Sequence, residues 1–297
     1  MFDTSLFRKN FEPEKLLFDE PMSDHTTFRI GGPAALMLLP DCADDIVTAL
    51  EVAKLAGVST FVMGGGSNLL VSDSGLDAVV IKLSKEYSDI ELDGDVITAQ
   101  AGASLSRLAA FAHRHGLAGL EFAAGIPGSL GGAVYMNAGA YGEEMSDRVK
   151  CAQLLKDGEI ALCDKALLGF SYRTSCMQTR GGLILSASLS LNPGDPGEIS
   201  AKMDELAKQR RDKQPLEYPS AGSTFKRPEG SFAGKLIEDA GLKGHSVGGA
   251  QVSHKHAGFI VNIGGATSRD VIDLIEHVKE QVYKRFGVEL EPEIRII

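Results

Sequence analysis

Two glycine-rich stretches hold the residues whose types and spacing first suggest chemistry. The longer one, residues 121–142, reads EFAAGIPGSLGGAVYMNAGAYG and carries six glycines and Pro127, with no charged residue after Glu121. Glycine costs a helix interior roughly 1 kcal/mol per residue and proline breaks it, so we expect no ordinary helix here. We expect buried, irregular backbone whose amide N–H groups face a large flat ligand, although a packing element against a sheet would need the same glycines.

The shorter stretch follows an apolar run at residues 58–63 and comprises Gly64, Gly65, Gly66, Ser67 and Asn68. A Rossmann site would need a helix to begin here, so that its N-terminus could hold a pyrophosphate. The continuation LLVSDSGLDAVVIKL instead predicts loop and strand, which leaves successive backbone N–H groups to bind an anion. A plain glycine turn is the alternative, but together the two stretches predict a long ligand with a diphosphate in its middle.

The composition is that of an ordinary globular protein, and it limits the partners. The 297 residues are 43% hydrophobic and 24% charged, enough for two or three subdomains. A formal net charge of −10 argues against a nucleic-acid or anionic-membrane partner. The N-terminus lacks the apolar core of a signal peptide, so we expect a cytoplasmic protein. We also expect a monomer or weak homo-oligomer. The four cysteines show no paired Cys-x-x-Cys spacing, so the sequence predicts neither a zinc site nor a disulfide framework. They are Cys42, Cys151, Cys163 and Cys176.

The elements that must position the glycine stretches are predicted from periodicity and turn residues. Residues 1–20 predict an amphipathic helix or arm. Asp41 is a suitable N-cap for a helix that Gly57 ends, and the strand and shorter glycine stretch follow it. Residues 149–163 predict a hairpin that turns at Asp157. This part of the chain therefore predicts a mixed α/β region.

The last third of the chain is set apart by a break at residues 192–197, which read NPGDPG. A polar helix is predicted over residues 198–213. Thr267 and Asp270 resemble a capping box for a further amphipathic helix. The final segment, 288–297, alternates between apolar and charged residues, which predicts a strand.

Two groups of titratable residues allow more than one interpretation. His254 and His256 are predicted on one face of a strand, where they could suit a metal, but no third ligand is evident and a structural pair is favoured. We predict no metal site. Basic residues crowd the end of the polar helix: Lys208, Arg210, Arg211 and Lys213. They could complement the helix dipole or form a rim that attracts phosphate, and the first interpretation is favoured.

Several longer motifs resemble the family of UDP-N-acetylenolpyruvoylglucosamine reductases, the flavin-dependent reductases of bacterial cell-wall precursor synthesis. The resemblance runs in order from about Thr26 to the last residues and covers nearly the whole chain. The STFKRP form resembles the subclass that lacks an inserted, substrate-covering tyrosine loop. The motifs are GGGSNLL (64–70), GIPGSLGGAVYMNAGAYG (125–142), SYR (171–173), PSAGSTFKRP (219–228), HAGFIVN (256–262) and LEPEIR (290–295).

The resemblance implies an α+β fold, of the vanillyl-alcohol-oxidase (PCMH) type. Two α/β subdomains, residues 1–83 and 84–192, would bind FAD non-covalently, and a C-terminal α/β domain, residues 193–297, would bind the substrate. The shorter glycine stretch would lie near the FAD pyrophosphate and the longer one along the flavin and ribityl chain. The implied cofactor-binding residues are Gly64, Gly65, Gly66, Ser67, Asn68, Gly125, Ile126, Pro127, Gly128, Gly131, Gly132 and Ala133.

The resemblance also implies a reaction and its residues. NADPH would give hydride to flavin N5, and the reduced flavin would deliver it to the enolpyruvyl ether of UDP-N-acetylglucosamine enolpyruvate, producing UDP-N-acetylmuramate. Arg173, Ser223 and Glu293 match the family's catalytic positions. The residues expected to bind the UDP-sugar are Tyr172, Lys226, Arg227, Gln251 and Arg295.

The chemistry of this reaction accounts for the three catalytic residue types. A vinyl ether conjugated to a carboxylate accepts hydride when the charge that develops on the carboxylate side is stabilised, and an arginine fork does that well. Glu293 would assist in a protonated or proton-sharing state, because two adjacent anions would repel. Ser223 would protonate the enolate-like carbon, and this feeble acid needs a relay or nearby cations. Lys226 and Arg227 could supply them, or could bind the UDP phosphates.

Without the resemblance, each residue has a plainer interpretation. Arg173 would be a surface strand arginine, Ser223 a turn serine and Glu293 part of the solvated face of an edge strand. Another oxidoreductase of the same flavin fold, acting on an alcohol or hydroxy acid, is the alternative enzyme. A flavin- or nucleotide-binding module without catalysis would not require the three residues together.

Overall fold

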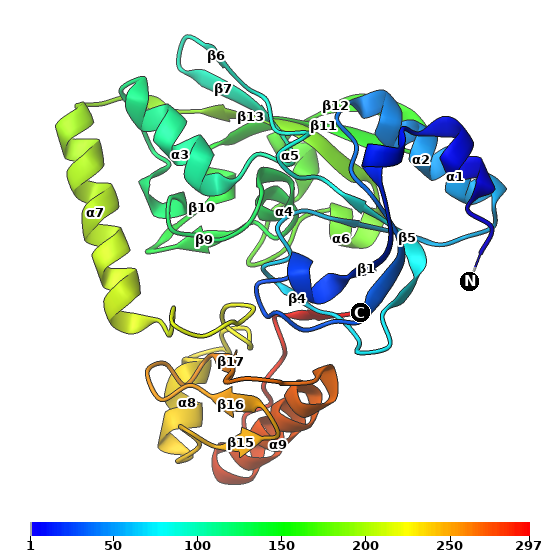
Figure 1. Ribbon diagram of the computed structural model, residues 1–297. Coiled ribbons are helices and arrows are strands. Elements are labelled where there is room, and N and C mark those ends of the chain that lie inside the picture. The colour runs from blue at the N-terminus through cyan, green and yellow to red at the C-terminus, as the bar shows by residue number, and fades with distance from the viewer. Residues whose placement is uncertain (1) are drawn as a thin grey trace. The chain divides into compact units, whose positions relative to one another are not determined.

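The computed structural model of this chain describes residues 2–297 (Figure 1). The chain forms two compact units, each built from several segments. Unit 1 comprises Met1–Leu17, Leu36–Gly65 and Ala78–Arg210, and unit 2 comprises Phe18–Ala35, Gly66–Asp77 and Arg211–Ile297. The chain passes from one unit to the other inside β1 (Leu16–Pro21), β2 (Pro33–Leu38), β5 (Leu76–Lys82) and α7 (Pro196–Lys213), and between Gly65 and Gly66.

An antiparallel sheet of five strands, in the order β12, β11, β13, β7, β6, forms the largest sheet of unit 1. Helix α4 (Leu130–Tyr135) packs against β7 and β13, and the apolar face of α3 (Leu105–Arg114) is buried. The strands are β6 (Ile90–Asp93), β7 (Val96–Gln100), β11 (Val149–Lys156), β12 (Glu159–Asp164) and β13 (Leu183–Ser190).

The hairpin prediction for residues 149–163 is confirmed. Lys156 of β11 pairs with Glu159 of β12 across a two-residue turn. The turn residues Asp157 and Gly158 have φ values of 54° and 84°. This left-handed backbone is the geometry that a tight hairpin turn requires, and Asp and Gly tolerate it.

A second sheet has the order β1, β2, β5, β3, in which β3 (Thr60–Met63) runs parallel to β5. Helix α1 (Ser5–Asn10) packs against α2 (Ala43–Leu55). The remaining short elements of unit 1 are the 3₁₀ turns η1 (Pro13–Lys15), η3 (Glu121–Ala123) and η4 (Met145–Asp147), the paired strands β8 (Leu117–Ala118) with β14 (Asn192–Pro193) and β9 (Gly139–Ala140) with β10 (Glu143–Glu144), and the helices α5 (Lys165–Leu168) and α6 (Met177–Arg180).

One expectation for the N-terminal region is met in part and another is wrong. Described residues 2–20 contain the short helix α1, the 3₁₀ turn η1 and then the start of β1, because the chain joins the sheet at Leu16 instead of extending the helix. Asp41 does not cap α2, whose N-cap is Cys42 with no side-chain hydrogen bond. The Lys15 ammonium lies 2.9 Å from the Asp41 carboxylate and 2.7 Å from that of Asp45, and these contacts raise the pKa of Lys15. An ion pair has taken the place of the expected cap.

Unit 2 has its own apolar core. Helices α8 (Ala233–Asp239) and α9 (Ser268–Phe286) pack with an antiparallel sheet of β15 (Ser246–Val247), β16 (Ala250–Val252) and β17 (Ile260–Asn262). The capping box at Thr267 and Asp270 is confirmed, since each side chain accepts the other residue's backbone N–H at 3.0 Å. A 3₁₀ turn, η2 (Met22–His25), also belongs to this unit.

The C-terminal segment is less regular than its alternation predicts. Only Arg295 and Ile296 form a strand, β18, which runs parallel to β4 (Leu69–Leu70). Pro292 lacks the N–H that a continuous ladder needs, and it makes a single bridge with Phe225. No helix of the described chain is long and apolar enough to cross a bilayer.

Candidate active site

Gly64 and Gly65, the first residues of the shorter glycine stretch, meet the longer stretch within unit 1. A Cβ on Gly64 would lie 1.9 Å from the Ser129 Oγ, and a Cβ on Gly65 would lie 3.0 Å from the Gly128 Cα. Only glycine allows backbones to approach this closely. From the sequence, we expected these glycines to let a ligand approach the backbone. In the structure, Gly64 and Gly65 let the two glycine stretches approach each other.

The N–H groups of these stretches are left largely available. Within residues 2–297, the backbone N–H groups of Gly64, Gly65, Gly66, Ser67 and Asn68 donate no hydrogen bond. The same holds, in the part of the chain that is described, for Gly128, Ser129 and Gly132. Backbone donors gathered at a glycine loop form a site for phosphate oxygens. The residues therefore fit a ligand that contains a diphosphate.

The longer stretch contains a helix that the sequence analysis did not expect. Helix α4 begins after Ser129 and includes Gly131 and Gly132. A Cβ on Gly131 would lie 2.8 Å from the Cβ of Ala101, so this glycine lets the helix pack closely on its neighbour. Tertiary packing has overridden the low helix propensity of glycine. At Gly131 the alternative of a packing element is correct.

Arg173 occupies the corner of a tight turn in unit 1. Ser171 and Thr174 exchange backbone hydrogen bonds at 3.0 and 3.1 Å across this turn. Arg173 has a φ of 54°, a conformation that costs a side-chain-bearing residue roughly 1–2 kcal/mol relative to the right-handed one. Its Nη2 donates to the Gly139 carbonyl at 3.0 Å, and its guanidinium carbon lies 5.3 Å from the centre of the half-exposed Tyr172 ring. A glycine would adopt this backbone without that cost, so Arg173 holds its side chain in place at the expense of an unfavourable φ.

Asn137 holds this turn against the longer glycine stretch, and the sequence analysis missed it. The residue is fully buried and has a φ of 42°. Its amide donates to the Ser171 carbonyl at 3.1 Å and accepts the Ser146 N–H at 2.9 Å. Burial and a left-handed backbone mark Asn137 as unusual, but both features exist only in the folded chain.

Ser223 and Glu293 lie on neighbouring segments of unit 2, and Thr224 joins them. Its carbonyl accepts the Glu293 N–H at 2.8 Å, and its own N–H donates to the Gly258 carbonyl at 2.8 Å. Ser223 is exposed and Glu293 is half-buried. The structure therefore brings together two of the three predicted catalytic residues within one compact unit.

Asn68 and Glu293 are also joined. The Asn68 side chain donates to the Glu293 carbonyl at 3.1 Å, and the Arg295 N–H donates to the Asn68 carbonyl at 2.9 Å. The segment that carries Glu293 is thus fixed on one side by Thr224 and on the other by Asn68.

Four of the five residues predicted to bind substrate, all except Tyr172, lie in unit 2. The Lys226 ammonium pairs with the Glu291 carboxylate, and the Gln251 amide donates to the Ser246 hydroxyl at 2.9 Å. The Arg227 guanidinium lies 4.0 Å from the centre of the Phe232 ring, which the sequence analysis did not single out. Arg295 is exposed on β18.

Arg210 behaves differently from an ordinary helix-end charge. A Cβ on Gly125 would lie 3.2 Å from its Cδ, so its stem contacts the longer glycine stretch. Burial lowers the pKa of its guanidinium, and no partner in the described chain hydrogen-bonds or ion-pairs with it. A desolvated cation beside this stretch could bind an anionic group of a ligand, which is the alternative that the sequence analysis favoured less.

The two histidines do not lie on a strand as expected. His254 and His256 belong to a turn between β16 and β17. The residues that could group around a metal ion, among those described, are Asp41, Cys42 and Asp45, and Lys15 already pairs with both of these carboxylates.

Comparison with known proteins gives a consistent picture. Residues 214–297 match the family described as UDP-N-acetylenolpyruvoylglucosamine reductase, C-terminal domain, and residues 34–164 match the FAD binding domain family. The chain is 50% identical to the UDP-N-acetylenolpyruvoylglucosamine reductase of Alkaliphilus oremlandii over 283 residues, which cover 95% of this chain and 93% of that protein. The enzyme of that name from Clostridium beijerinckii is 48% identical, with 98% and 96% covered.

A solved structure agrees with these matches. The crystal structure of UDP-N-acetylenolpyruvylglucosamine reductase from Thermus caldophilus superposes with a TM-score of 0.83 at 37% identity. The match covers 95% of this chain and 97% of that one.

Proposed function

Because this chain belongs to the family of UDP-N-acetylenolpyruvoylglucosamine reductases, we propose that Arg173, Ser223 and Glu293 carry out its reaction. The chain is an FAD-dependent enzyme that uses NADPH to reduce UDP-N-acetylglucosamine enolpyruvate to UDP-N-acetylmuramate for peptidoglycan synthesis. Bound FAD supplies the chemistry of accepting a hydride from NADPH and passing it to the enolpyruvyl group. The proposal concerns what the chain's own residues contribute.

The glycine stretches are proposed to hold FAD through their main chain. Five successive N–H groups from Gly64 to Asn68 suit the pyrophosphate, and those of Gly128, Ser129 and Gly132 suit the adjoining part of the cofactor. Arg210, with its lowered pKa and its stem against Gly125, is a further candidate for an anionic group of the cofactor. These donors compensate for the acidic net charge of the chain, which offers no general attraction for phosphate.

Arg173 is proposed to stabilise the charge that develops on the substrate carboxylate. Its guanidinium is permanently charged and forked, and one arm is already fixed by the Gly139 carbonyl. A charged group that is already oriented before the reaction needs little reorganisation energy during it. The unfavourable φ of Arg173 is therefore the cost of aiming the guanidinium.

Ser223 is proposed to donate the proton that completes the reduction, and Glu293 to share a proton with the polarised carboxylate. The observation that carries this proposal is the pairing through Thr224, whose carbonyl accepts the Glu293 N–H at 2.8 Å directly beside Ser223. Two segments 70 positions apart in the sequence thereby present a hydroxyl and a carboxyl from one hydrogen-bonded frame.

We also propose which parts of the chain bind the cofactor and which bind the substrate. Residues 1–83 and 84–192 would hold FAD, and residues 193–297 would hold the UDP-sugar. The side chains proposed to bind this sugar are Tyr172, from residues 84–192, and Lys226, Arg227, Gln251 and Arg295. We infer a cytoplasmic enzyme that acts as a monomer or weak homo-oligomer, without nucleic-acid partners. The acidic net charge supports the last inference.

Anaerobic mixing of the FAD-loaded protein tests the function. NADPH should bleach the flavin absorbance, and UDP-N-acetylglucosamine enolpyruvate should then restore it without oxygen. Reduction of the flavin by alcohols or hydroxy acids, with no reoxidation by the enolpyruvyl substrate, would support the alternative oxidoreductase instead. A flavin inert to both reagents would support a binding module.

A further inference from the structure

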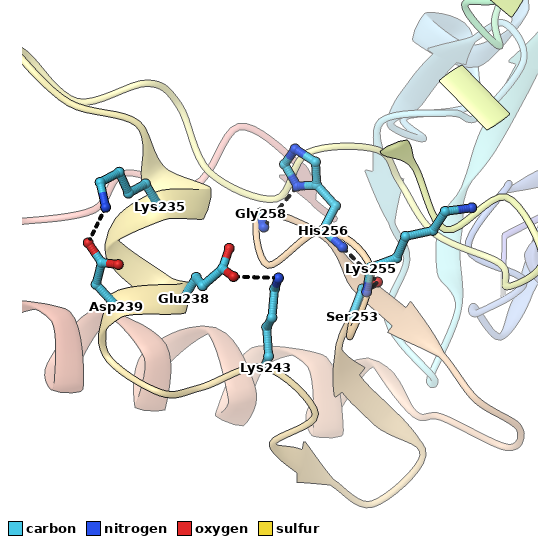
Figure 2. A network of polar contacts seen from close by, with 8 residues as sticks. All are labelled: Lys235, Glu238, Asp239, Lys243, Ser253, Lys255, His256 and Gly258. Carbon is cyan, nitrogen blue, oxygen red and sulfur yellow. Dashed lines mark hydrogen bonds and ion pairs between the residues drawn. The ribbon is translucent and has the colours of Figure 1, made fainter. Parts of the chain in front are cut away.

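A short turn in unit 2, residues 253–259, is built around the imidazole of His256 (Figure 2). The His256 Nδ1 accepts the Gly258 N–H at 3.1 Å, and the His256 carbonyl accepts the Phe259 N–H at 3.0 Å. The Ser253 hydroxyl oxygen accepts the N–H groups of Lys255 and His256 at 3.1 and 3.3 Å. Every backbone N–H named here donates to an acceptor within residues 253–259, so the turn is a closed hydrogen-bonded unit.

This turn is the support of the segment that carries Ser223. The Gly258 carbonyl accepts the Thr224 N–H at 2.8 Å, and the Thr224 hydroxyl oxygen accepts the Ile260 N–H at 3.0 Å. Ser223 itself forms an antiparallel bridge with Phe259. Gly258 thus receives Thr224 on its carbonyl side while His256 holds it on its amide side.

The arrangement requires a neutral imidazole with its proton on Nε2. A proton on Nδ1 would face the Gly258 N–H, and the two donors would repel. The ring is half-buried, edge-on to Phe259 at 5.0 Å between centroids. Helix α8 packs against the ring, since a Cβ on Gly234 would lie 3.2 Å from both the His256 Cε1 and the Gly258 nitrogen.

The surrounding groups favour the neutral form. Burial is the largest influence on His256 and lowers its pKa; a backbone hydrogen bond raises the pKa, Lys243 lowers it and Glu238 raises it, and the net shift is downward. Glu238 of α8 and Lys243 of the following loop form an ion pair of 2.7 Å, visible in Figure 2, so their effects oppose one another. Lys255, in the turn itself, directs its ammonium to the Arg211 carbonyl at 2.6 Å. On α8, Lys235 is paired with Asp239.

We propose that His256 is a positioning residue for Ser223, and that its neutral imidazole holds the turn on which the proton-donating segment rests. The inference rests on the proposed role of Ser223. Protonation of His256 breaks the Nδ1 bond to Gly258, loosens the Gly258 carbonyl from Thr224 and displaces the Ser223 hydroxyl. Below the pH at which His256 titrates, the substrate-consuming half-reaction slows while flavin reduction by NADPH continues.

Two variants separate this role from a merely structural one. His256→Asn places an amide oxygen near the position of Nδ1 and cannot titrate, whereas His256→Leu keeps the bulk but offers no acceptor. We expect His256→Leu to slow flavin reoxidation by substrate about tenfold, the value of one hydrogen bond, with flavin reduction unchanged within about twofold. His256→Asn should keep reoxidation within about threefold of the parent at pH 8 and should not show the slowing that the parent shows below the ordinary histidine pKa of 6.5.

An independent measurement uses no turnover. In the FAD-loaded, isotopically labelled protein, the Gly258 amide resonance should shift with pH in step with the His256 ring, and this shift should vanish in His256→Asn. A Gly258 amide insensitive to His256 titration would overturn the proposal, as would an unchanged acid limb in His256→Asn or equal slowing of both half-reactions in His256→Leu. If Ser223→Ala leaves reoxidation intact, the role of Ser223 fails, while the amide titration still tests the turn.

Discussion

Unit 1 and unit 2 prepare their chemistry in opposite ways. In unit 1 the groups offered to the cofactor are mainly main-chain N–H donors, which lie where Gly64 and Gly65 let two backbones approach closely. In unit 2 they are the side chains of Ser223 and Glu293, held by backbone bonds to Thr224, Gly258 and Asn68. A main-chain site depends on the absence of side chains, whereas a side-chain site depends on a rigid frame behind it.

The largest effect is expected where a single side chain performs the chemistry. Ser223→Ala should slow flavin reoxidation by substrate about 10²- to 10⁴-fold, because a general acid contributes that much. Flavin reduction by NADPH should stay nearly intact, since the variant leaves the frame around Thr224 unchanged. Stopped-flow absorbance of each half-reaction measures both. Equal loss in the two half-reactions would contradict the acid role.

Arg173 tests whether unit 1 also depends on one side chain. Arg173→Gly should lower turnover at least about 100-fold, because the electrostatic stabilisation of the substrate carboxylate is removed. The free energy of unfolding should change by no more than about 1 kcal/mol, since relief of the left-handed backbone offsets the lost bond to Gly139.

Steady-state kinetics and denaturant unfolding measure the two effects. Arg173→Asn is the matched control, because asparagine tolerates the same backbone without the charge. If either variant retains full turnover, the role of the guanidinium is wrong.

Gly64→Ala tests the main-chain site. Its Cβ would overlap the Ser129 Oγ at 1.9 Å, and overpacking of about 1–3 kcal/mol should weaken FAD binding about 5- to 150-fold. Gly132→Ala is the matched control, since its nearest neighbour would lie at an ordinary 3.7 Å and its N–H is kept.

Fluorescence titration with FAD gives the affinities. Adding Ser129→Ala to Gly64→Ala should recover part of the loss, because the overlapping hydroxyl is gone. If Gly132→Ala weakens FAD binding as much as Gly64→Ala does, the steric explanation is incorrect.

The smallest effect concerns the frame of unit 2. The pKa of Asp270 is lowered chiefly by the Thr267 N–H, and its carboxylate also accepts the Gly249 N–H at 3.3 Å. A carboxyl with a lowered pKa in the folded state stabilises the fold fully above its unfolded pKa, near 3.8, and this contribution is lost as pH falls through the folded value.

Asp270→Asn should therefore lower the melting temperature by a few degrees at pH 7 and by less at pH 3. Thermal unfolding followed by circular dichroism at both values measures the difference. Asp204→Asn, on the polar helix α7, provides a control with no capping role. A deficit at pH 3 as large as that at pH 7 would exclude the ionised cap as its source.

Local patterns in the sequence determined the elements whose signals are complete within a few residues. The hairpin at 149–163 needed only alternation and Asp157 with Gly158, and the cap of α9 needed only Thr267 and Asp270. The glycine stretches were visible in composition because a main-chain site is defined by missing side chains. The motifs of the family identified Arg173, Ser223 and Glu293 as candidates, but spacing alone would not have.

The tertiary structure decided what depended on distant partners. Asp41 pairs with Lys15 instead of capping α2, and α4 forms through glycines because Gly131 packs on Ala101. Asn137 acquires its place only when Ser171 is brought beside it, and the His256 turn supports Ser223 only because the Gly258 carbonyl meets the distant Thr224 N–H. Sequence patterns report short-range preferences, whereas these contacts join residues whose proximity only the folding of the chain creates.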